Sequence, residues 1–308
     1  MRSRWNPDHN ARRLMLILWA VMGCGRPERA PDGWPDNGCE AETSAAGSHT
    51  HSEESYVLLT TDETELAIGA LWPKKTRCAG AIVLVPPGYE RGLKLLHGNQ
   101  AESLAAANVA VISWDPRGRG DSNGNENHNG HVGQDDLAEL LRWTADHKNI
   151  DPNAVMLYSR SFGGAIAAGA LARHSDLQPM LWLDYESPGF LEEDLAYASE
   201  YNQENFASVL VDEEDPDAWW GQREPAGFMS EITTPYHRLQ GLPDHALGTY
   251  IGHARAMLDN ATSADELLYN GEHVSTPFDE DDARDNAIAG GLDPTDDTVT
   301  DTIIAVFQ

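Results

Sequence analysis

Residues 158–165 read YSRSFGGA, and the apolar segments on either side of this stretch indicate the fold. An apolar run at 154–157 precedes it, and a longer apolar segment at 165–171 follows it. The first run has the length of a buried strand, whereas the second is too long for one strand and is typical of a buried helix. The sequence therefore predicts a sharp turn from a strand into a helix, built from serine and glycine.

Strand and helix patterns alternate through the rest of the chain. Helices are predicted at 93–108 and 134–147, and strands at 56–61, 65–72, 81–85, 109–114, 154–158, 180–184, 236–240 and 266–269. Alternation at this spacing predicts an α/β fold, a mostly parallel eight-stranded sheet with helices on both faces. The aromatic and acidic stretch 190–230 is longer than one crossover helix requires, which predicts an inserted helical cap, with a plain surface excursion as the alternative.

The first 55 residues differ in kind from the rest. Basic residues precede a short apolar run at 14–22, a pattern typical of a secretory signal and too short to span a bilayer. Residues 21–24 resemble a bacterial lipobox, so residues 1–23 are predicted to be a signal peptide. Lipid on Cys24 would anchor the exported protein to a membrane of the bacterial cell envelope; ordinary secretion or an uncleaved anchor is the alternative. Residues 24–55 are predicted to be a flexible linker and 56–308 the folded domain.

Charge and cysteine content narrow the partners and the compartment. The chain has 21 Lys+Arg against 50 Asp+Glu, a formal net charge of -29. That charge disfavours nucleic acid and anionic membrane surfaces as partners. Apart from Cys24, the chain contains Cys39 and Cys78, and an exported pair is a candidate disulfide.

Five segments follow predicted strands at the sheet edge where ligands of such folds bind. They are 86–89 (PPGY), 115–122 (DPRGRGDS), 159–164 (SRSFGG), 241–245 (GLPDH) and 270–273 (NGEH). With them the chain resembles the α/β-hydrolase superfamily over residues 56–308, in particular its esterases, lipases and serine aminopeptidases. In the G-x-S-x-G pattern of that superfamily, Ser161 takes the nucleophile position and Gly163 the second glycine, whereas Ser159 replaces the first glycine.

The resemblance implies a catalytic triad in the order Ser, Asp, His. A serine hydroxyl is a weak nucleophile and needs a histidine to take its proton and an acid to orient that histidine. Asp244, after the seventh predicted strand, is the implied acid, and His273, after the eighth, is the implied base. Alternatives remain open: His245 and His253 for the base, and Asp212, Asp259 and Asp265 for the acid.

The resemblance also implies an oxyanion hole. One donor is the backbone N–H of the residue after the nucleophile, which is Phe162 here, and the second should come from the loop after the third strand. Tyr89 is the expected second donor, although Pro87 replaces the histidine of the common form of that loop. Residues 115–122 match a D-x-R-G-x-G-x-S loop, whose expected role is to shape a turn.

The sequence thus predicts a serine hydrolase that cleaves a small-molecule acyl ester through an acyl-enzyme, with no cofactor and no metal. An aminopeptidase or amidase with the same triad is the second interpretation, and a non-catalytic lipoprotein that binds ligands on this fold is the third. Serine at the nucleophile position argues against dehalogenase and epoxide-hydrolase chemistry, whose families carry Asp there. The sequence leaves the oligomeric state open.

Overall fold

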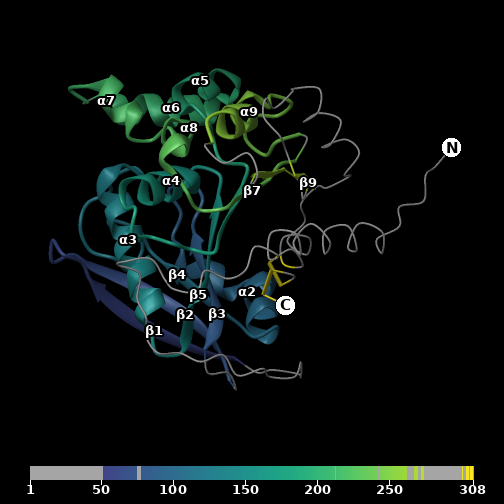
Figure 1. The fold of residues 1–308 in the computed structure, drawn as a ribbon. Helices are drawn as coiled ribbons and strands as arrows, with labels where there is room; N and C mark the ends of the chain where they lie inside the picture. Colours follow the sequence, from purple (N-terminus) through teal and green to yellow (C-terminus); the bar gives the residue numbers. More distant parts are fainter. Residues whose placement is uncertain are drawn as a thin grey trace.

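The computed structural model (Figure 1) describes most of the predicted domain. The described residues are 51–74, 78–211, 213–241, 243–261, 267–269, 272–273, 300, 303–304 and 306–307, with side chains omitted for 267–269 and 272–273. The predicted signal peptide, the predicted lipidation site Cys24 and the greater part of the predicted linker lie outside them. Cys78 is disulfide-bonded, and Cys39, its predicted partner, also lies outside the described residues.

A single twisted sheet organises the described part of the chain. Its nine strands lie in the order β1-β2-β4-β3-β5-β6-β7-β8-β9. They are β1 (His51–Leu59), β2 (Glu65–Pro73), β3 (Ala79–Val85), β4 (Val109–Trp114), β5 (Ile150–Arg160), β6 (Leu181–Tyr185), β7 (Tyr236–Leu239), β8 (Leu267–Tyr269) and β9 (Glu272–His273). The strands from β4 to β8 run parallel, whereas β1, β2 and β9 are antiparallel to their neighbours.

This architecture confirms the predicted α/β fold with a mostly parallel sheet. The described residues contain one strand more than the eight predicted, because the chain turns back after β8 and pairs His273 with Leu268. The first strand begins at His51, inside the segment predicted as linker, because residues 51–55 pair with residues 69–73 of β2. Residues 51–55 are polar or charged, so a pattern of apolar residues does not predict this part of the strand.

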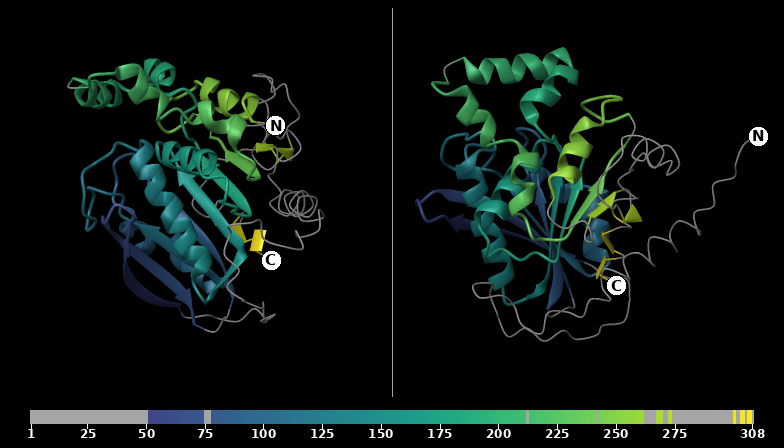
Figure 2. Two further views of the ribbon diagram at one scale, coloured as in Figure 1. Left: turned by 60° about the vertical axis from the view of Figure 1, so that its left-hand side comes forward. Right: turned by 45° about the horizontal axis from the view of Figure 1, so that its top comes forward.

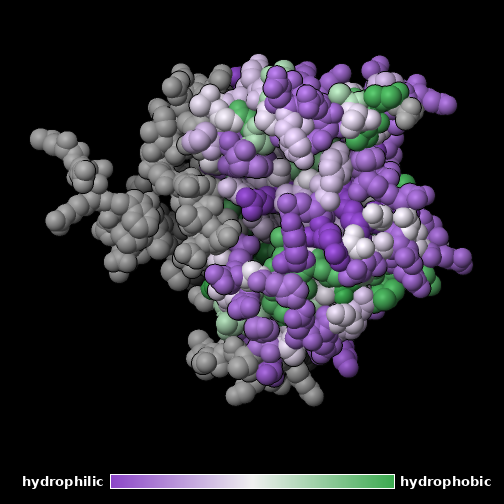
Figure 3. Space-filling model, turned by 180° about the vertical axis from the view of Figure 1, so that it is seen from behind, coloured by the Kyte–Doolittle hydropathy of each residue, from purple (hydrophilic) through white to green (hydrophobic). Residues whose placement is uncertain are grey.

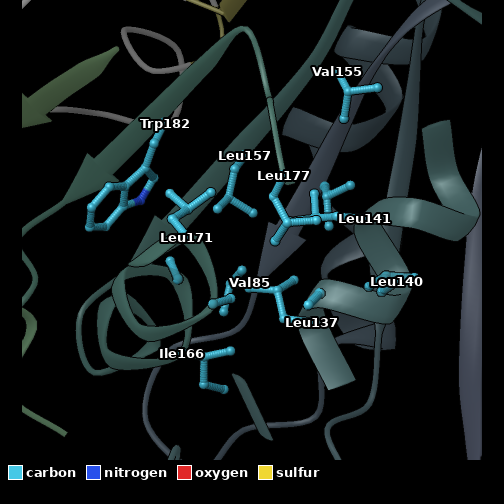
Figure 4. Packing of buried hydrophobic residues seen from close by; sticks show 14 of the residues in the cluster. Val85, Leu137, Leu140, Leu141, Val155, Leu157, Ile166, Leu171, Leu177 and Trp182 are labelled. Atoms are coloured by element: carbon cyan, nitrogen blue, oxygen red, sulfur yellow. The ribbon is translucent and has the colours of Figure 1, made fainter. Parts of the chain in front are cut away.

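Helices cover both faces of the sheet. On one face α3 (His131–Asp146) and α4 (Gly163–Arg173) pack, and on the other lie η1 (Leu93–His97) and α2 (Asn99–Ala106). The helix predicted at 93–108 is interrupted at Gly98, whose backbone is extended. Figure 4 shows the core under α3 and α4, where Leu137, Leu141 and Leu157 meet with no exposed surface. Truncating one such leucine to alanine costs about 2–5 kcal/mol.

An insertion of short helices, residues 191–231, separates β6 from β7 in the segment where the sequence predicts a cap. It comprises α5 (Leu191–Asp194), η2 (Leu195–Tyr197), α6 (Glu200–Leu210), α7 (Pro216–Gly221), α8 (Pro225–Phe228) and η3 (Met229–Glu231). In Figures 1 and 2 these helices lie together with α9 (Gly252–Asp259) at one end of the sheet. Side chains of α6 and α7 pack on Phe162, so the insertion covers the turn after β5.

One buried arginine fastens the insertion to the body of the domain. Arg223 donates to the backbone oxygens of Asn127, His128 and Trp219 at 2.6 to 2.7 Å. Its guanidinium also lies 4.0 Å from the ring centroid of Trp219. Arg223 therefore links the loop before α3 to the helix α7.

The face of the molecule drawn in Figure 3 is predominantly polar. Hydrophilic side chains cover most of the described face in Figure 3, as the excess of acidic residues leads one to expect. Among the described residues, no helix has the length and apolar character that crossing a bilayer would require.

Candidate active site

Ser161 occupies the turn between β5 and α4. Its φ of 53° is a conformation that residues with a side chain rarely adopt and that recurs where function requires it. The Ser161 N–H donates to the Tyr185 oxygen at 2.8 Å, and the Gly164 N–H donates to the Ser161 oxygen at 2.9 Å. A Cβ at Gly163 would lie 2.6 Å from the backbone oxygen of Pro86, which explains the glycine.

Ser159, the residue that replaces the first glycine of the motif, lies fully buried beneath this turn. Its hydroxyl accepts from Trp182 Nε1 at 2.8 Å and donates to Asp184 Oδ1 at 3.2 Å. Asp184 in turn accepts from Arg238 Nη1 at 2.8 Å. The departure from the motif therefore supplies a hydroxyl to a buried network, and Ser161 is the serine that the turn presents.

The imidazole that reaches Ser161 belongs to His245. Its Nε2 lies 2.9 Å from Ser161 Oγ, and its Nδ1 is hydrogen-bonded to Glu186 Oε2. An ionised carboxylate only accepts hydrogen bonds, so Nδ1 carries the proton and the Nε2 lone pair faces the serine hydroxyl. This tautomer is the one in which a histidine can take a proton from serine.

Glu186 immediately follows β6 and orients His245. Its side chain is 1% exposed, and its φ of 53° matches that of Ser161. Oε1 accepts from the Gly241 N–H at 2.7 Å, and Oε2 accepts from the backbone N–H of His245 at 3.2 Å as well as from the ring. Three N–H donors thus surround a buried carboxylate, a setting that fixes its position.

Asp244, the predicted acid, lies beside His245 but forms its hydrogen bonds with other residues. Oδ1 accepts from the N–H groups of Ala246 and Leu247 at 2.7 and 2.8 Å. Oδ2 accepts from Gln240 Nε2 at 2.9 Å and meets His253 Nε2 at 3.1 Å. Its closest approach to His245 Nδ1 is 3.7 Å.

The bonding of Asp244 indicates a structural role in the turn that carries His245. Burial alone would raise the pKa of Asp244, but the hydrogen bonds from His253 and Gln240 hold that pKa well below its usual range. The carboxylate is therefore ionised and accepts the N–H groups of its own turn.

Of the other candidate residues, two have described side chains that bond away from Ser161, and three lie outside the described side chains. His253 is fully buried on α9, where burial lowers the pKa of its imidazole, and its Nε2 meets Gln240 Oε1 as well as Asp244. Asp259 forms an ion pair with Arg255 on the same helix. The His273 side chain, Asp212 and Asp265 lie outside the described residues, so the assignment of His273 as base stays a prediction.

Two backbone N–H groups in the segments expected to form an oxyanion hole have no acceptor among the described residues. They are the N–H groups of Phe162 and Tyr89. Phe162 also precedes the first residue of α4, where the helix dipole adds positive potential. The loop that carries Tyr89 is held by Arg119, whose Nη1 donates to the Gly88 oxygen at 3.0 Å.

The D-x-R-G-x-G-x-S loop has the architectural role expected of it. Buried Asp115 accepts from the N–H groups of Leu93 and Asp121 at 3.0 and 2.9 Å. Gly118 and Gly120 adopt positive φ angles of 73° and 55°. These contacts shape the turn after β4.

Glu186 is the site residue that sequence reasoning missed. The five segments that the sequence singles out after predicted strands do not include the one after β6, which reads ESPG at 186–189. The same rule that selected the others, a polar residue directly after a parallel strand, would have found it.

A metal ion could in principle contact the same groups. Atoms of Glu186, Asp244 and His245 that can bind metals lie within 4.8 Å of one another. In the structure these atoms are hydrogen-bonded to each other, to backbone N–H groups or to Gln240 and His253. That bonding fits an acid and base pair without a metal ion.

Comparisons with known proteins agree with this fold. A family model described as serine aminopeptidase, S33, matches residues 77–190, somewhat more than a third of the chain and a range that includes Ser161 and Glu186. No curated protein matches.

Several solved hydrolase structures are similar. Acetyl xylan esterase 1 from Thermoanaerobacterium sp. JW/SL YS485 is 12% identical with a TM-score of 0.58, over 98% of this chain and 93% of that one. The Pyrococcus furiosus esterase Pf2001 is 13% identical with a TM-score of 0.54, over 82% and 92%. A Mycobacterium tuberculosis puromycin-hydrolyzing peptidase is 13% identical with a TM-score of 0.59, over 71% of this chain but 35% of that one. The chain therefore has the α/β-hydrolase fold.

Proposed function

We propose that this protein is a serine hydrolase that cleaves carboxylic esters of small molecules through an acyl-enzyme. The observation that carries the proposal is the contact of 2.9 Å between Ser161 Oγ and His245 Nε2, at a strained turn and backed by buried Glu186. In this proposal Ser161 is the nucleophile, His245 the general base and Glu186 the acid that orients it.

The first half of the reaction forms the acyl-enzyme. His245 Nε2 takes the Ser161 proton as Oγ bonds to the substrate carbonyl carbon, and the N–H groups of Phe162 and Tyr89 stabilise the oxygen that gains the negative charge. Glu186 stabilises the imidazolium that forms. The tetrahedral intermediate collapses, the carbon–oxygen bond of the ester breaks, and His245 gives its proton to the departing alkoxide.

The second half releases the acid. His245 takes a proton from water, the resulting hydroxide bonds to the acyl carbon, and the same two N–H groups stabilise the second oxyanion. The bond to Ser161 Oγ then breaks, and His245 returns the proton to the serine. No cofactor takes part in these steps.

Two further assignments compete within this proposal. The predicted pair of Asp244 and His273 would give the same chemistry with a different base, so replacing each histidine separately distinguishes them. Amide or peptide hydrolysis is the second candidate function, favoured by the match to the serine aminopeptidase model. Esters rank first because an alkoxide leaves more readily than an amine, so a triad of this kind cleaves them with less assistance.

Activity assays on purified protein separate these functions. We expect turnover of short and medium acyl esters and a loss on the order of a millionfold in kcat for Ser161→Ala. Ser208→Ala, an exposed serine on α6, is the control and should keep wild-type activity. Turnover of aminoacyl arylamides without turnover of esters would reverse the ranking, and equal activity of the Ser161→Ala and wild-type proteins would favour a binding scaffold.

We further propose export and a lipid anchor at Cys24. The support is the signal-like segment at 1–23 and the disulfide at Cys78, because disulfides persist in oxidising compartments. Cys24→Ser should move the protein from the membrane fraction to the soluble fraction of the cell envelope. Unchanged membrane association would contradict the anchor.

A further inference from the structure

One arginine beside the nucleophile differs from the other arginines that the structure describes. Seven of the nine form ion pairs with carboxylates: Arg91, Arg117, Arg119, Arg142, Arg173, Arg238 and Arg255. An eighth, Arg223, donates to three backbone oxygens. Arg160 alone forms neither an ion pair nor a side-chain hydrogen bond with any described residue.

The missing partner is notable because carboxylates are abundant. The chain carries 50 acidic residues against 21 basic ones, so a guanidinium on its surface would readily find a carboxylate. A guanidinium offers five N–H donors in a planar fork that suits a carboxylate. Arg160 is half-buried, at the last position of β5, and it directly precedes Ser161.

The ring of Tyr185 lies between Arg160 and His245 and contacts both side chains. The Arg160 guanidinium is 5.1 Å from the centroid of the Tyr185 ring. On that ring the imidazole of His245 stacks, with centroids 6.2 Å apart and planes inclined by 25°. The distance from the guanidinium to the imidazole is therefore at most the sum of 5.1 and 6.2 Å. A small ester can bridge that distance.

We propose that Arg160 binds an anionic group of the substrate, a carboxylate, and that the enzyme therefore prefers esters that carry a negative charge near the scissile bond. This inference rests on the proposed ester hydrolysis at Ser161. The charge of Arg160 opposes the repulsion that the net charge of -29 exerts on anions. Binding of the carboxylate places the ester carbonyl beside Ser161.

Two pairs of esters that differ only in charge test the inference. On the acyl side they are p-nitrophenyl hydrogen adipate and its methyl ester, and on the leaving-group side para-acetoxybenzoate and its methyl ester. The kcat/KM of each is measured for wild type, Arg160→Met, Arg160→Lys and the control Arg255→Met, which removes an equal charge from the surface of α9.

We expect the wild type to prefer the anionic member of at least one pair. Arg160→Met should lower kcat/KM for that ester by roughly tenfold to a hundredfold, the range of a charge-assisted hydrogen bond, and change the neutral ester by less than about twofold. Arg160→Lys should keep part of the preference, and Arg255→Met all of it. Added salt should reduce the preference of the wild type.

The outcomes separate this inference from the proposed function. Turnover of the neutral esters combined with equal losses for both members of each pair in Arg160→Met, or no preference in the wild type, would overturn the role of Arg160 alone. Absence of turnover of all four esters would overturn the ester hydrolase and the role of Arg160 together.

Discussion

Replacing Glu186 by glutamine tests the acid of the proposed triad without changing the shape of the side chain. The carboxylate accepts from Gly241, from the backbone N–H of His245 and from its Nδ1. An amide has one oxygen and one NH₂ group in place of two oxygens. In one orientation the NH₂ group faces the Gly241 N–H, and in the other it faces the backbone N–H of His245 and the ring. In the second orientation the NH₂ group can donate to Nδ1 only when the imidazole carries its proton on Nε2.

That tautomer is incompatible with catalysis. With its proton on Nε2, His245 points an N–H at Ser161 Oγ and has no lone pair to take the serine proton. The equivalent change in a Ser-His-Asp enzyme lowers kcat by about ten-thousandfold. We expect a similar loss for Glu186→Gln, about 5 kcal/mol of transition-state stabilisation, with little change in KM.

Asp244→Asn provides the comparison that decides between the two acids. The side chain of Asp244 holds the turn that carries His245 and bonds to His253. We expect Asp244→Asn to lower kcat by roughly tenfold, the cost of one weakened hydrogen bond, and to lower the melting temperature. Initial rates on a p-nitrophenyl ester and melting curves of both variants are measured in parallel.

The opposite pattern of losses would assign the acid to Asp244. If Glu186→Gln keeps kcat within about tenfold of wild type while Asp244→Asn loses a thousandfold or more, Asp244 is the acid and the sequence-based assignment holds. The rate of Glu186→Gln is interpreted only if its melting temperature is unchanged, which shows that the variant is folded.

Further predictions concern stability. Burial raises the pKa of Asp194 to about 7, so its contribution to stability is complete below the unfolded pKa of about 4 and is lost as pH rises through about 7. The melting temperature of Asp194→Asn should therefore equal that of wild type near pH 4 and exceed it at about pH 8. A difference in melting temperature that does not change with pH would contradict this. Gly163→Ala places a Cβ 2.6 Å from the Pro86 oxygen, which should lower both the melting temperature and the ester turnover. Unchanged values would show that the loop containing Pro86 moves to make room for the methyl group. Arg223→Met removes three hydrogen bonds and should cost roughly 3 kcal/mol in chemical denaturation, whereas an unchanged midpoint would show that the insertion is held by other contacts.

Most of the fold could be predicted because local patterns dictate it. The apolar run before YSRSFGGA became β5 and the longer one after it became α4, since length alone distinguishes a buried strand from a buried helix. The strand at 51–55 could not be predicted, because its residues pair through their backbone and keep polar side chains outside. The break at Gly98 depends on backbone angles that a helical pattern does not reveal.

The candidate site was predicted in part. Ser161 and the two N–H groups proposed for the oxyanion hole lie in short motifs, so the sequence can nominate them without knowledge of the tertiary structure. The contact of His245 with Ser161 joins residues 84 positions apart, and it depends on the exact turn after β7. His245 was among the alternatives for the base, whereas Glu186 could be chosen over Asp244 only when the geometry of that turn was known.

Labelling with a fluorophosphonate, read by intact mass and peptide mapping, tests whether His245 activates Ser161. We expect a single adduct on Ser161 in the wild type, at a rate that His245→Ala abolishes and His273→Ala leaves within about twofold of wild type. If labelling persists in folded His245→Ala but disappears in folded His273→Ala, the base that activates Ser161 is His273 and the proposed triad is wrong.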